Sequence, residues 1–466
     1  MEASLARNHE RGFYKLSGLQ RIGFGSGDLA QNLIYNTVST YLLFFYTNVF
    51  GINPAAAATM FLVVRIIDAI WDPVVGTIVD KHSTRFGKYR GYLVFAGLPL
   101  SVLAILIFWN GFSGSLLYAY ITYVGLSMLY TFLNVPYGAL NASLTRDNDE
   151  ITKLTTTRMF LANLGGLAVA YGVPVLVKLF SSDGTWDTKS SASGWLITMA
   201  IYAGVGFLIL LFCFSQTKEK VVMDDAKQEE VKVSDLVTEF KRNKPLRILA
   251  FFFITAFAMM SIGNAGGSYY MQYVVQASDD VQWFNALGSI PAFIFLPLVP
   301  KIKKMIGKKG MFLVFLGIAI LGMLFIYLIP NPQNHITLVL IAQFIKSTGI
   351  IVATGYMWAL VPEVISYGEL QSGKRISGVV NALTGFFFKF GMALGGVVPG
   401  FVLSMTGYVA GDEHQSAFAQ QGILWLVAVL PAILLIVAMI IISKYDLTDE
   451  KIYEINKQIE SRSSSI

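Results

Sequence analysis

Three ionisable residues share one apolar segment of this 466-residue chain. Arg65, Asp68 and Asp72 follow one another at spacings of three and four, so a helix places their side chains on one face. Counted from Asp80 at the end of the segment, Asp68 lies about 18 Å deep at 1.5 Å per residue. Two carboxylates one turn apart repel each other, and burial penalises their charge further. The pair can therefore bind a proton or a small cation; the alternative is a structural Arg65–Asp68 ion pair, which leaves one carboxylate over.

A second polar group lies in the segment 115–141, where Tyr130 and Asn134 share a helix face and Thr131 adjoins them. Hydroxyl and amide groups hydrogen-bond to sugar hydroxyls, and a tyrosine ring stacks on a sugar face. Hydrogen bonding between helices is the common alternative for such residues in membranes.

A polar stripe opens the segment 27–50, in which Asp28, Gln31, Asn32 and Tyr35 recur at helical spacing. The remainder of that segment is apolar. We interpret the stripe as facing a substrate.

The segment 376–407 contains Lys389 near mid-depth, together with Thr384. A buried lysine requires an anion, which Asp68, Asp72 or Glu363 can supply. A structural salt bridge between the two halves of the chain is the alternative. Asn264 is a weaker candidate in the segment 248–275.

The composition identifies what must position these residues. Apolar residues make up 55% and charged residues 14%, against about 25% charged in soluble domains. The mean hydropathy is +0.58. These values exclude a soluble enzyme, a disordered chain and a fibrous protein, and they predict an all-α, multi-pass membrane protein.

Twelve segments are long enough to span about 30 Å of hydrocarbon. They are 27–50, 57–79, 91–109, 115–141, 156–180, 194–215, 248–275, 281–300, 310–330, 335–365, 376–407 and 419–443. Of the 35 basic residues, 29 fall in alternate connections and at the two ends, which predicts that both termini are cytoplasmic. The same distribution explains the pI of about 9.0 without nucleic acid.

The chain divides into two six-helix halves, 1–215 and 248–443, joined by a cytoplasmic linker, 216–247, and followed by a tail, 444–466. Short basic loops containing glycine follow the second and the eighth segment. Matched halves of this kind predict a transporter built from two repeats.

Nothing in the sequence resembles a nucleotide-binding loop, a metal cluster or a hydrolytic triad, and all four histidines lie in loops or at span ends. We therefore expect neither an enzyme nor a bound cofactor, and we predict transport driven by an ion gradient. A channel, a sugar sensor and an exchanger are the alternatives.

Five motifs resemble the glycoside–pentoside–hexuronide:cation symporters, the melibiose permease relatives of the major facilitator superfamily. They are GSGDLAQNLIYNTVSTYLLFFYTNVFG, RIIDAIWDPVVG, RFGKYRGYL, YTFLNVPYGAL and SYGELQSGKR, and the resemblance covers nearly the whole chain. It implies the major facilitator fold of twelve helices.

The resemblance also implies a coupling-cation site. Asp68 and Asp72 match its two aspartates and Thr131 its threonine, whereas Trp71 stands where the family has an asparagine. Loss of that amide oxygen removes a ligand suited to Na⁺ and favours H⁺, although Asn134 lies near enough to restore an oxygen.

For the sugar site, the resemblance matches Tyr130, Arg158 and Lys389 to a tyrosine, an arginine and a lysine. In an ungapped comparison, Gln31 and Asn32 occupy the positions of a lysine–aspartate pair, and Asn134 that of a second aspartate. Both acidic sugar ligands thus become amides, which argues against melibiose.

We therefore predict H⁺-coupled symport of a pentoside such as isoprimeverose or another xyloside, in the bacterial cytoplasmic membrane. The alternatives are Na⁺-coupled symport of another oligosaccharide, a β-glucoside or a hexuronide, and sugar exchange. The expected partners are the sugar and membrane lipid.

Overall fold

The computed structural model describes residues 14–82, 84–145, 148–219, 233–372, 377–412 and 414–463. Parts of the predicted cytoplasmic segments, including 1–13 and 220–232, lie outside these ranges. Throughout the described ranges the regular elements are helices, and the one β-interaction is an isolated bridge between Thr84 and Gly87. The prediction of an all-α protein is confirmed. The chain separates into two compact units, residues 1–227 with 409–413 and residues 228–408 with 414–466.

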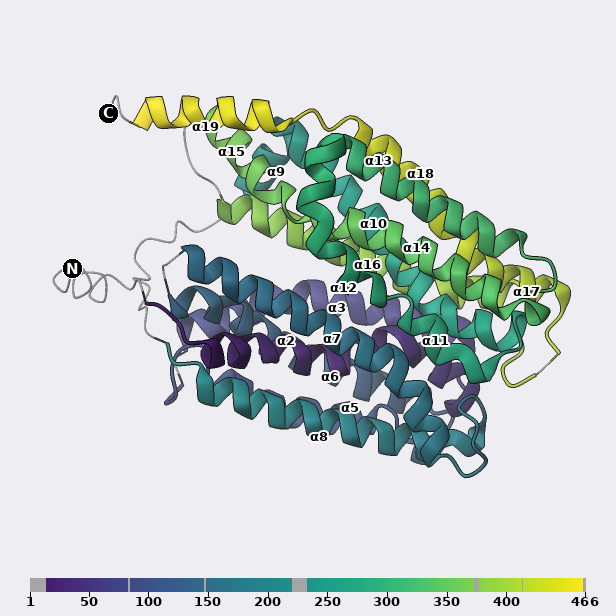
Figure 1. Ribbon diagram of the computed structural model, residues 1–466. Helices are drawn as coiled ribbons and strands as arrows, with labels where there is room; N and C mark the ends of the chain where they lie inside the picture. The colour runs from purple at the N-terminus through teal and green to yellow at the C-terminus, as the bar shows by residue number, and fades with distance from the viewer. Residues whose placement is uncertain are drawn as a thin grey trace. The chain divides into compact units, whose positions relative to one another are not determined.

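The first unit contains the predicted spans one to six (Figure 1). Its helices are α2 (Gly18–Phe44), continued by the π-helical turn η1 (Phe45–Phe50), α3 (Pro54–Lys81), α4 (Tyr92–Phe95), α5 (Gly97–Leu106), η2 (Asn110–Phe112), α6 (Leu116–Leu144), α7 (Asn148–Phe180), η3 (Lys189–Ser191) and α8 (Ala192–Gln216). The first helix begins outside the predicted span because Ser17 and Gln20 form a capping box at its start.

The second unit contains the predicted spans seven to twelve. Its elements are α9 (Val233–Arg242), α10 (Lys244–Tyr269), η5 (Tyr270–Val274), η6 (Ser278–Asp280), α11 (Val281–Ala286), α12 (Ile290–Phe295), η7 (Leu296–Leu298), α13 (Val299–Leu328), η8 (Pro332–Asn334), α14 (Ile336–Met357), α15 (Leu360–Ser372), α16 (Ser377–Met405), α17 (Ala417–Leu424), η9 (Trp425–Val429), α18 (Leu430–Ser443) and α19 (Asp449–Ser463). The predicted linker thus contains a helix, α9, and the predicted tail contains α19.

The two units repeat one packing scheme. In the first, α2 packs against α7 and α8, and α3 packs against α6. In the second, α10 packs against α16 and α18, and α12 packs against α14. The first helix of each unit therefore contacts the fifth and sixth, and the second contacts the fourth. This equivalence within each unit supports the prediction of two repeated halves.

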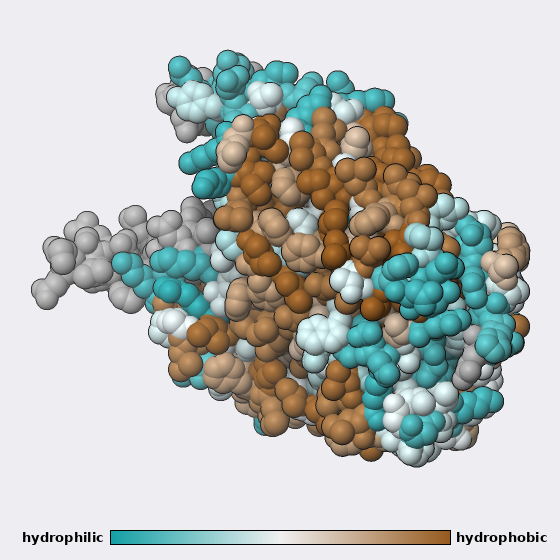
Figure 2. Space-filling view, turned by 45° about the vertical axis from the view of Figure 1, so that its right-hand side comes forward, coloured by the Kyte–Doolittle hydropathy of each residue, from teal (hydrophilic) through white to brown (hydrophobic). Residues whose placement is uncertain are grey.

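Within the described ranges, eight helical segments are long and apolar enough to cross a membrane. The helices of the first two predicted spans, α2 and α3, are not among them, and the third predicted span is represented by the shorter apolar segment Tyr92–Leu106. Large apolar side chains nevertheless remain on the surface, such as Leu117 at 71% exposure, and Figure 2 shows broad hydrophobic areas. Lipid covers such surfaces in a membrane protein.

The predicted eighth span is broken. It consists of α11, α12 and η7, with residues 287–289 forming turns between the first two. Pro291 and Pro297 cannot donate backbone hydrogen bonds, which is the local reason for the short pieces. The next helix, α13, is kinked at Gly307, whose φ of 73° suits glycine.

Candidate functional site

An ion pair lies within α3, between Arg65 and Asp68, and a hydrogen bond from Ser127 joins the same carboxylate to α6. Arg65 Nη1 lies 3.3 Å from Asp68 Oδ2, and the Ser127 hydroxyl donates to Asp68 Oδ1 at 2.5 Å. The Asp68 side chain is only 14% exposed. The Asp68 carboxyl group is therefore held by both an arginine and a hydroxyl group.

The second carboxylate lies one turn further along α3, against the same helix. The Thr131 hydroxyl donates to Asp72 Oδ1 at 3.1 Å and also contacts the Ser127 carbonyl at 3.3 Å. The structure thus brings Asp68, Asp72 and Thr131 together, as the family resemblance implies. Ser127, which sequence reasoning missed, adds a fourth oxygen-bearing side chain; its i, i+4 relation to Thr131 was the available signal.

Trp71 does not face these oxygens as a ligand. Its indole Nε1 donates to the Met128 carbonyl at 3.3 Å, and its ring packs edge-on against Phe132 of α6. The side chain that stands in place of the family's asparagine therefore ties α3 to α6.

Two stacked tyrosines connect this carboxylate pair to α2. The rings of Tyr35 and Tyr130 lie 5.2 Å apart with an interplanar angle of 25°. The Arg65 guanidinium group also interacts electrostatically with the Tyr35 hydroxyl group. The predicted substrate-facing tyrosines and the predicted ion-binding carboxylates thus form one connected cluster inside the first unit.

A second ion pair joins α2 to α7. Arg158 Nε lies 2.5 Å from Asp28 Oδ2, and Nη2 lies 3.3 Å from Oδ1, which is a two-point contact. The guanidinium group lies 4.8 Å from the centre of the Tyr137 ring, and the Tyr137 hydroxyl donates to Asp28 at 3.2 Å. A bidentate arrangement fixes both side chains and leaves carboxylate lone pairs and guanidinium protons for a polar ligand.

Close packing makes this geometry possible. A β-carbon at Gly27 would lie 2.4 Å from the Tyr137 ring, so only glycine lets α6 approach α2 here. A β-carbon at Gly165 of α7 would likewise lie 3.1 Å from Asn32. The glycines at the start of α2 therefore serve helix packing.

The two amides of α2 are directed differently from the prediction. Gln31 is buried and donates to the Gly27 carbonyl at 3.3 Å, while Asn32 donates to the Asp28 carbonyl at 2.8 Å and accepts from Asn36. Both bond to their own helix. The carboxylate beside Arg158 is Asp28, so α2 places an acidic group beside the arginine of the predicted sugar site. The predicted match of Gln31 and Asn32 to a lysine–aspartate pair stays a prediction.

Asn134 of α6 is exposed, and its side chain makes no hydrogen bond to another described residue. It is therefore available to a ligand. Gly138, one turn further on, has open space where a β-carbon would stand.

The candidates in the second unit are more dispersed. Lys389 and Asn264 are exposed on α16 and α10, whereas Thr384 is buried and donates to the Val380 carbonyl of its own helix at 2.8 Å. Helix bonding of this kind leaves the Thr384 hydroxyl without a free proton.

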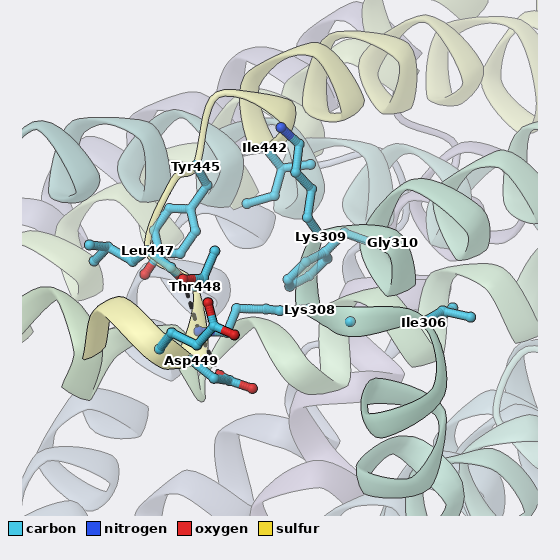
Figure 3. A pocket seen from close by; sticks show the side chains of 12 residues that line it. Ile306, Lys308, Lys309, Gly310, Ile442, Tyr445, Leu447, Thr448 and Asp449 are labelled. Atoms are coloured by element: carbon cyan, nitrogen blue, oxygen red, sulfur yellow. Dashed lines mark hydrogen bonds and ion pairs between the residues drawn. The ribbon is translucent and has the colours of Figure 1, made fainter. Parts of the chain in front are cut away.

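Glu363 has a partner that the sequence did not predict. Lys308 Nζ lies 2.6 Å from Glu363 Oε1 and 3.2 Å from Asp449 Oδ1, and Tyr445 donates to Glu363 at 3.1 Å. Figure 3 shows Lys308, Tyr445 and Asp449 at a pocket of about 330 Å³ between α13 and the end of α18. Glu363 thus belongs to a cluster at the attachment of α19, where it neutralises Lys308 and not Lys389.

In the described part of the chain, no three metal-binding side chains of histidine, cysteine, aspartate or glutamate converge. The candidate ion site of the first unit instead offers two carboxylates and two hydroxyls. Oxygen ligands of this type suit a proton or a hard monovalent cation.

Two helical units with buried charge pairs among apolar helices are the architecture of a membrane transporter. Comparison with known proteins is specific on this point: residues 23–449 match the model of the family described as MFS/sugar transport protein. The chain belongs to this family, and its fold is that of the major facilitator superfamily. It is a transporter and not an enzyme, as predicted.

Curated relatives of the chain are themselves described as carriers. The chain is 48% identical over 452 residues to an uncharacterized symporter of Bacillus subtilis, YnaJ, covering 96% of both chains. It is 32% identical to the glucuronide carrier protein homolog of Escherichia coli, with 96% of both covered. It is also 32% identical to the isoprimeverose transporter of Lactiplantibacillus pentosus, covering 87% of this chain and 83% of that protein.

Solved structures confirm the fold. A crystal structure of a D-xylose-proton symporter superposes with a TM-score of 0.62 at 14% identity, covering 92% of this chain and 97% of the other. At that identity the similarity concerns the fold alone.

Proposed function

We propose that the protein is a cation-coupled symporter of a glycoside in the bacterial cytoplasmic membrane, with both termini cytoplasmic. The observation that carries the proposal is the connected cluster of the first unit, in which Asp68 and Asp72 lie beside the stacked Tyr35 and Tyr130. An ion site and a sugar-stacking surface in direct contact are what coupled transport requires.

The two carboxylates have different surroundings, which suggests a division of roles. Asp68 is neutralised by Arg65 and held by Ser127, whereas Asp72 receives the Thr131 hydroxyl. We assign the coupling proton to Asp72. Protonation of Asp72 removes its charge from the interior of the first unit and lets the site close around the sugar, so that ion and sugar together permit the change between outward and inward states.

The sugar is assigned to the polar surface of the first unit. Asp28 and Arg158 provide acceptors and donors for adjacent hydroxyl groups, Tyr130 provides a ring face, and Asn134 provides an exposed amide. Lys389 of α16 is kept as a further proposed sugar ligand, on the family resemblance alone. A pentoside such as isoprimeverose is the first substrate to test, supported by the 32% identity to the isoprimeverose transporter.

Sodium coupling is the second candidate, and a specific observation favours it. Ser127 and Thr131 place hydroxyl groups against Asp68 and Asp72, giving four oxygen-bearing side chains from two helices. A hexuronide is likewise the second substrate class, because a cation such as Arg158 can bind a carboxylate and a relative is described as a glucuronide carrier homolog.

Uptake into proteoliposomes tests these assignments. Isoprimeverose, methyl-xyloside and a glucuronide are offered under an imposed pH gradient and then under an imposed Na⁺ gradient. Accumulation with the pH gradient alone supports the proton assignment, and Asp72→Asn should then abolish accumulation while sugar counterflow continues. Wild-type accumulation by Asp72→Asn contradicts the role given to Asp72.

A C-terminal reporter that is active only in the cytoplasm tests the orientation. The proposal requires activity from a fusion after Ser463 and none from a fusion in the 181–191 connection.

A further inference from the structure

The second unit contains a buried lysine that no part of the proposed transport site uses. Lys346 lies on α14, and its side chain is only 6% exposed. Gly322 of α13 packs against the backbone of Lys346. A β-carbon at Gly322 would lie 2.4 Å from the backbone amide nitrogen of Lys346. The side chain extends toward α11, and Nζ lies 5.5 Å from the centre of the Phe284 ring.

No acidic side chain pairs with Lys346 within the described ranges. Apart from Tyr327, which lies five residues beyond Gly322 on α13 and is 41% exposed, the charged and titratable residues on α14 itself and on the elements packed against it lie two turns or more away along the helices. At 1.5 Å per residue, His335 is about 16 Å away along α14, and Glu363 lies beyond the end of that helix, on α15. The remaining groups on these elements are Lys301, Lys303, Lys304, Lys308, Lys309, Tyr327, Tyr356, Tyr367 and Glu369.

The energetics of an ammonium group at this position are unfavourable. Burying an unpaired ion is costly even after the surroundings relax. A single aromatic ring offsets only part of that cost. The Phe284 ring alone therefore does not hold Lys346 permanently charged, and the imbalance can be removed by losing the proton.

A hydrogen-bond acceptor for the charged form lies one turn away. Gln343 shares the helix face of Lys346, at a spacing of three residues. Its Nε2 donates to the Phe284 carbonyl at 3.2 Å, whereas its buried Oε1 has no partner among the described residues. The amide is thus held with its free oxygen available to an N–H donor.

The covering element is suited to movement. Phe284 belongs to α11, which has six residues and ends at the break over 287–289. Discontinuous helices in transporters mark ion and substrate positions because their ends can shift without unwinding a whole span.

We propose that Lys346 binds and releases a proton during transport, with Gln343 Oε1 as acceptor in the charged state and Phe284 as the cover in the neutral state. Protonation forms one N–H bond from the amine lone pair and a proton delivered by water, and release returns that proton to water. The site lies wholly in the second unit and does not depend on ion binding at Asp68 and Asp72.

Thermal unfolding of the purified protein tests the proton directly. Wild type and Lys346→Met are compared from pH 5.5 to 9.5 in one detergent. If the folded protein has released a proton that the unfolded chain holds, the wild type gains stability relative to the variant as pH rises, by up to tenfold in the unfolding constant per pH unit. A difference that stays constant over this range overturns the proposal.

Sugar counterflow without any ion gradient tests the link to transport. The ratio of the wild-type rate to the Lys346→Met rate should change at least threefold across the same pH range, because Asp68 and Asp72 are intact in both proteins. Lys189→Met, which removes an exposed lysine of the outer connection, is the matched control and should keep a constant ratio.

A second variant covers the case in which Lys346→Met does not fold. Gln343→Leu removes the acceptor and keeps the volume, so it should shift the pH dependence of counterflow without abolishing transport. A Gln343→Leu profile identical to that of the wild type contradicts the proposal. If Asp72→Asn loses ion-driven accumulation while Lys346→Met still changes the pH dependence of counterflow, the two ion sites act independently.

Discussion

The Asp28–Arg158 pair allows a prediction whose sign does not depend on the identity of the sugar. Asp28→Asn removes the negative charge and leaves the guanidinium group of Arg158 between α2 and α7 without its partner. Breaking a buried ion pair on one side costs about 3–5 kcal/mol. The side chains are 17% and 23% exposed, so water lowers this figure, and we expect about 1–3 kcal/mol.

Thermal unfolding of the purified protein measures this cost. For a unit of this size, 1 kcal/mol corresponds to about 2–4 °C, so Asp28→Asn should lower the Tm by about 2–12 °C. Adding Arg158→Gln to the same protein removes the unpaired charge. The double variant should therefore unfold at a higher temperature than Asp28→Asn alone, and the double-mutant cycle should give a coupling energy of about 1–3 kcal/mol.

The reasoning is refuted if the losses of the two single variants simply add. Additivity within about 0.5 kcal/mol is the behaviour of independent sites. Lys244→Gln is a suitable control, because its side chain is 60% exposed and its ion pair with the exposed Asp446, at 3.9 Å, should contribute little. Sugar binding by the same variants then separates a structural role from a binding role: Asp28→Asn should weaken binding even where the protein remains folded.

Three further predictions concern the candidate ion site, the buried Glu150 at the start of α7, and Lys308 beside the start of α19. Trp71→Asn returns an amide oxygen to the face of α3 and should make sugar uptake respond to Na⁺; uptake that still ignores Na⁺ would show that Trp71 does not decide the ion. The Glu150 carboxyl is buried, which raises its pKa, but hydrogen bonds from Lys153, Arg21 and the Leu16 amide outweigh this and hold the pKa below its usual value. Its stabilisation is therefore present above the pKa of the unfolded chain and lost as pH falls, so the Tm difference between wild type and Glu150→Gln should shrink in acid; a difference independent of pH would contradict the charge-based account. Lys308→Met removes bonds to Glu363, Asp449 and the Leu447 carbonyl, and hydrogen exchange in α19 should rise at least tenfold, whereas Lys309→Met, in the same pocket, should leave exchange near the wild-type rate.

Hydropathy and charge placement were sufficient to predict the helical class and most spans. This succeeds because a backbone in lipid must satisfy its own hydrogen bonds, which leaves the helix as the element for an apolar stretch of 20 residues. The same rule failed locally at the eighth span, where two prolines and the turn at 287–289 divide the segment into short pieces. Hydropathy averages over a window and does not register these breaks.

The candidate ion site could also be predicted from the sequence. Arg65, Asp68 and Asp72 lie on one helix, so their common face follows from the period of 3.6 residues and needs no tertiary information. The position of Thr131 opposite them came from the family resemblance, and the structure brings its hydroxyl to 3.1 Å from Asp72.

Contacts between distant segments required the tertiary structure. Asp28 and Arg158 are 130 residues apart, and no periodicity relates them; only the packing of α2 against α7 through small residues brings them together. Glu363 similarly pairs with Lys308 because α13 and α15 converge where α19 attaches. The sequence by itself determined which residues were too polar to lie in lipid without a partner. The choice of each partner depended on helix packing, because a buried charge is stabilised by whichever opposite charge or hydrogen-bonding group the fold places within about 3 Å.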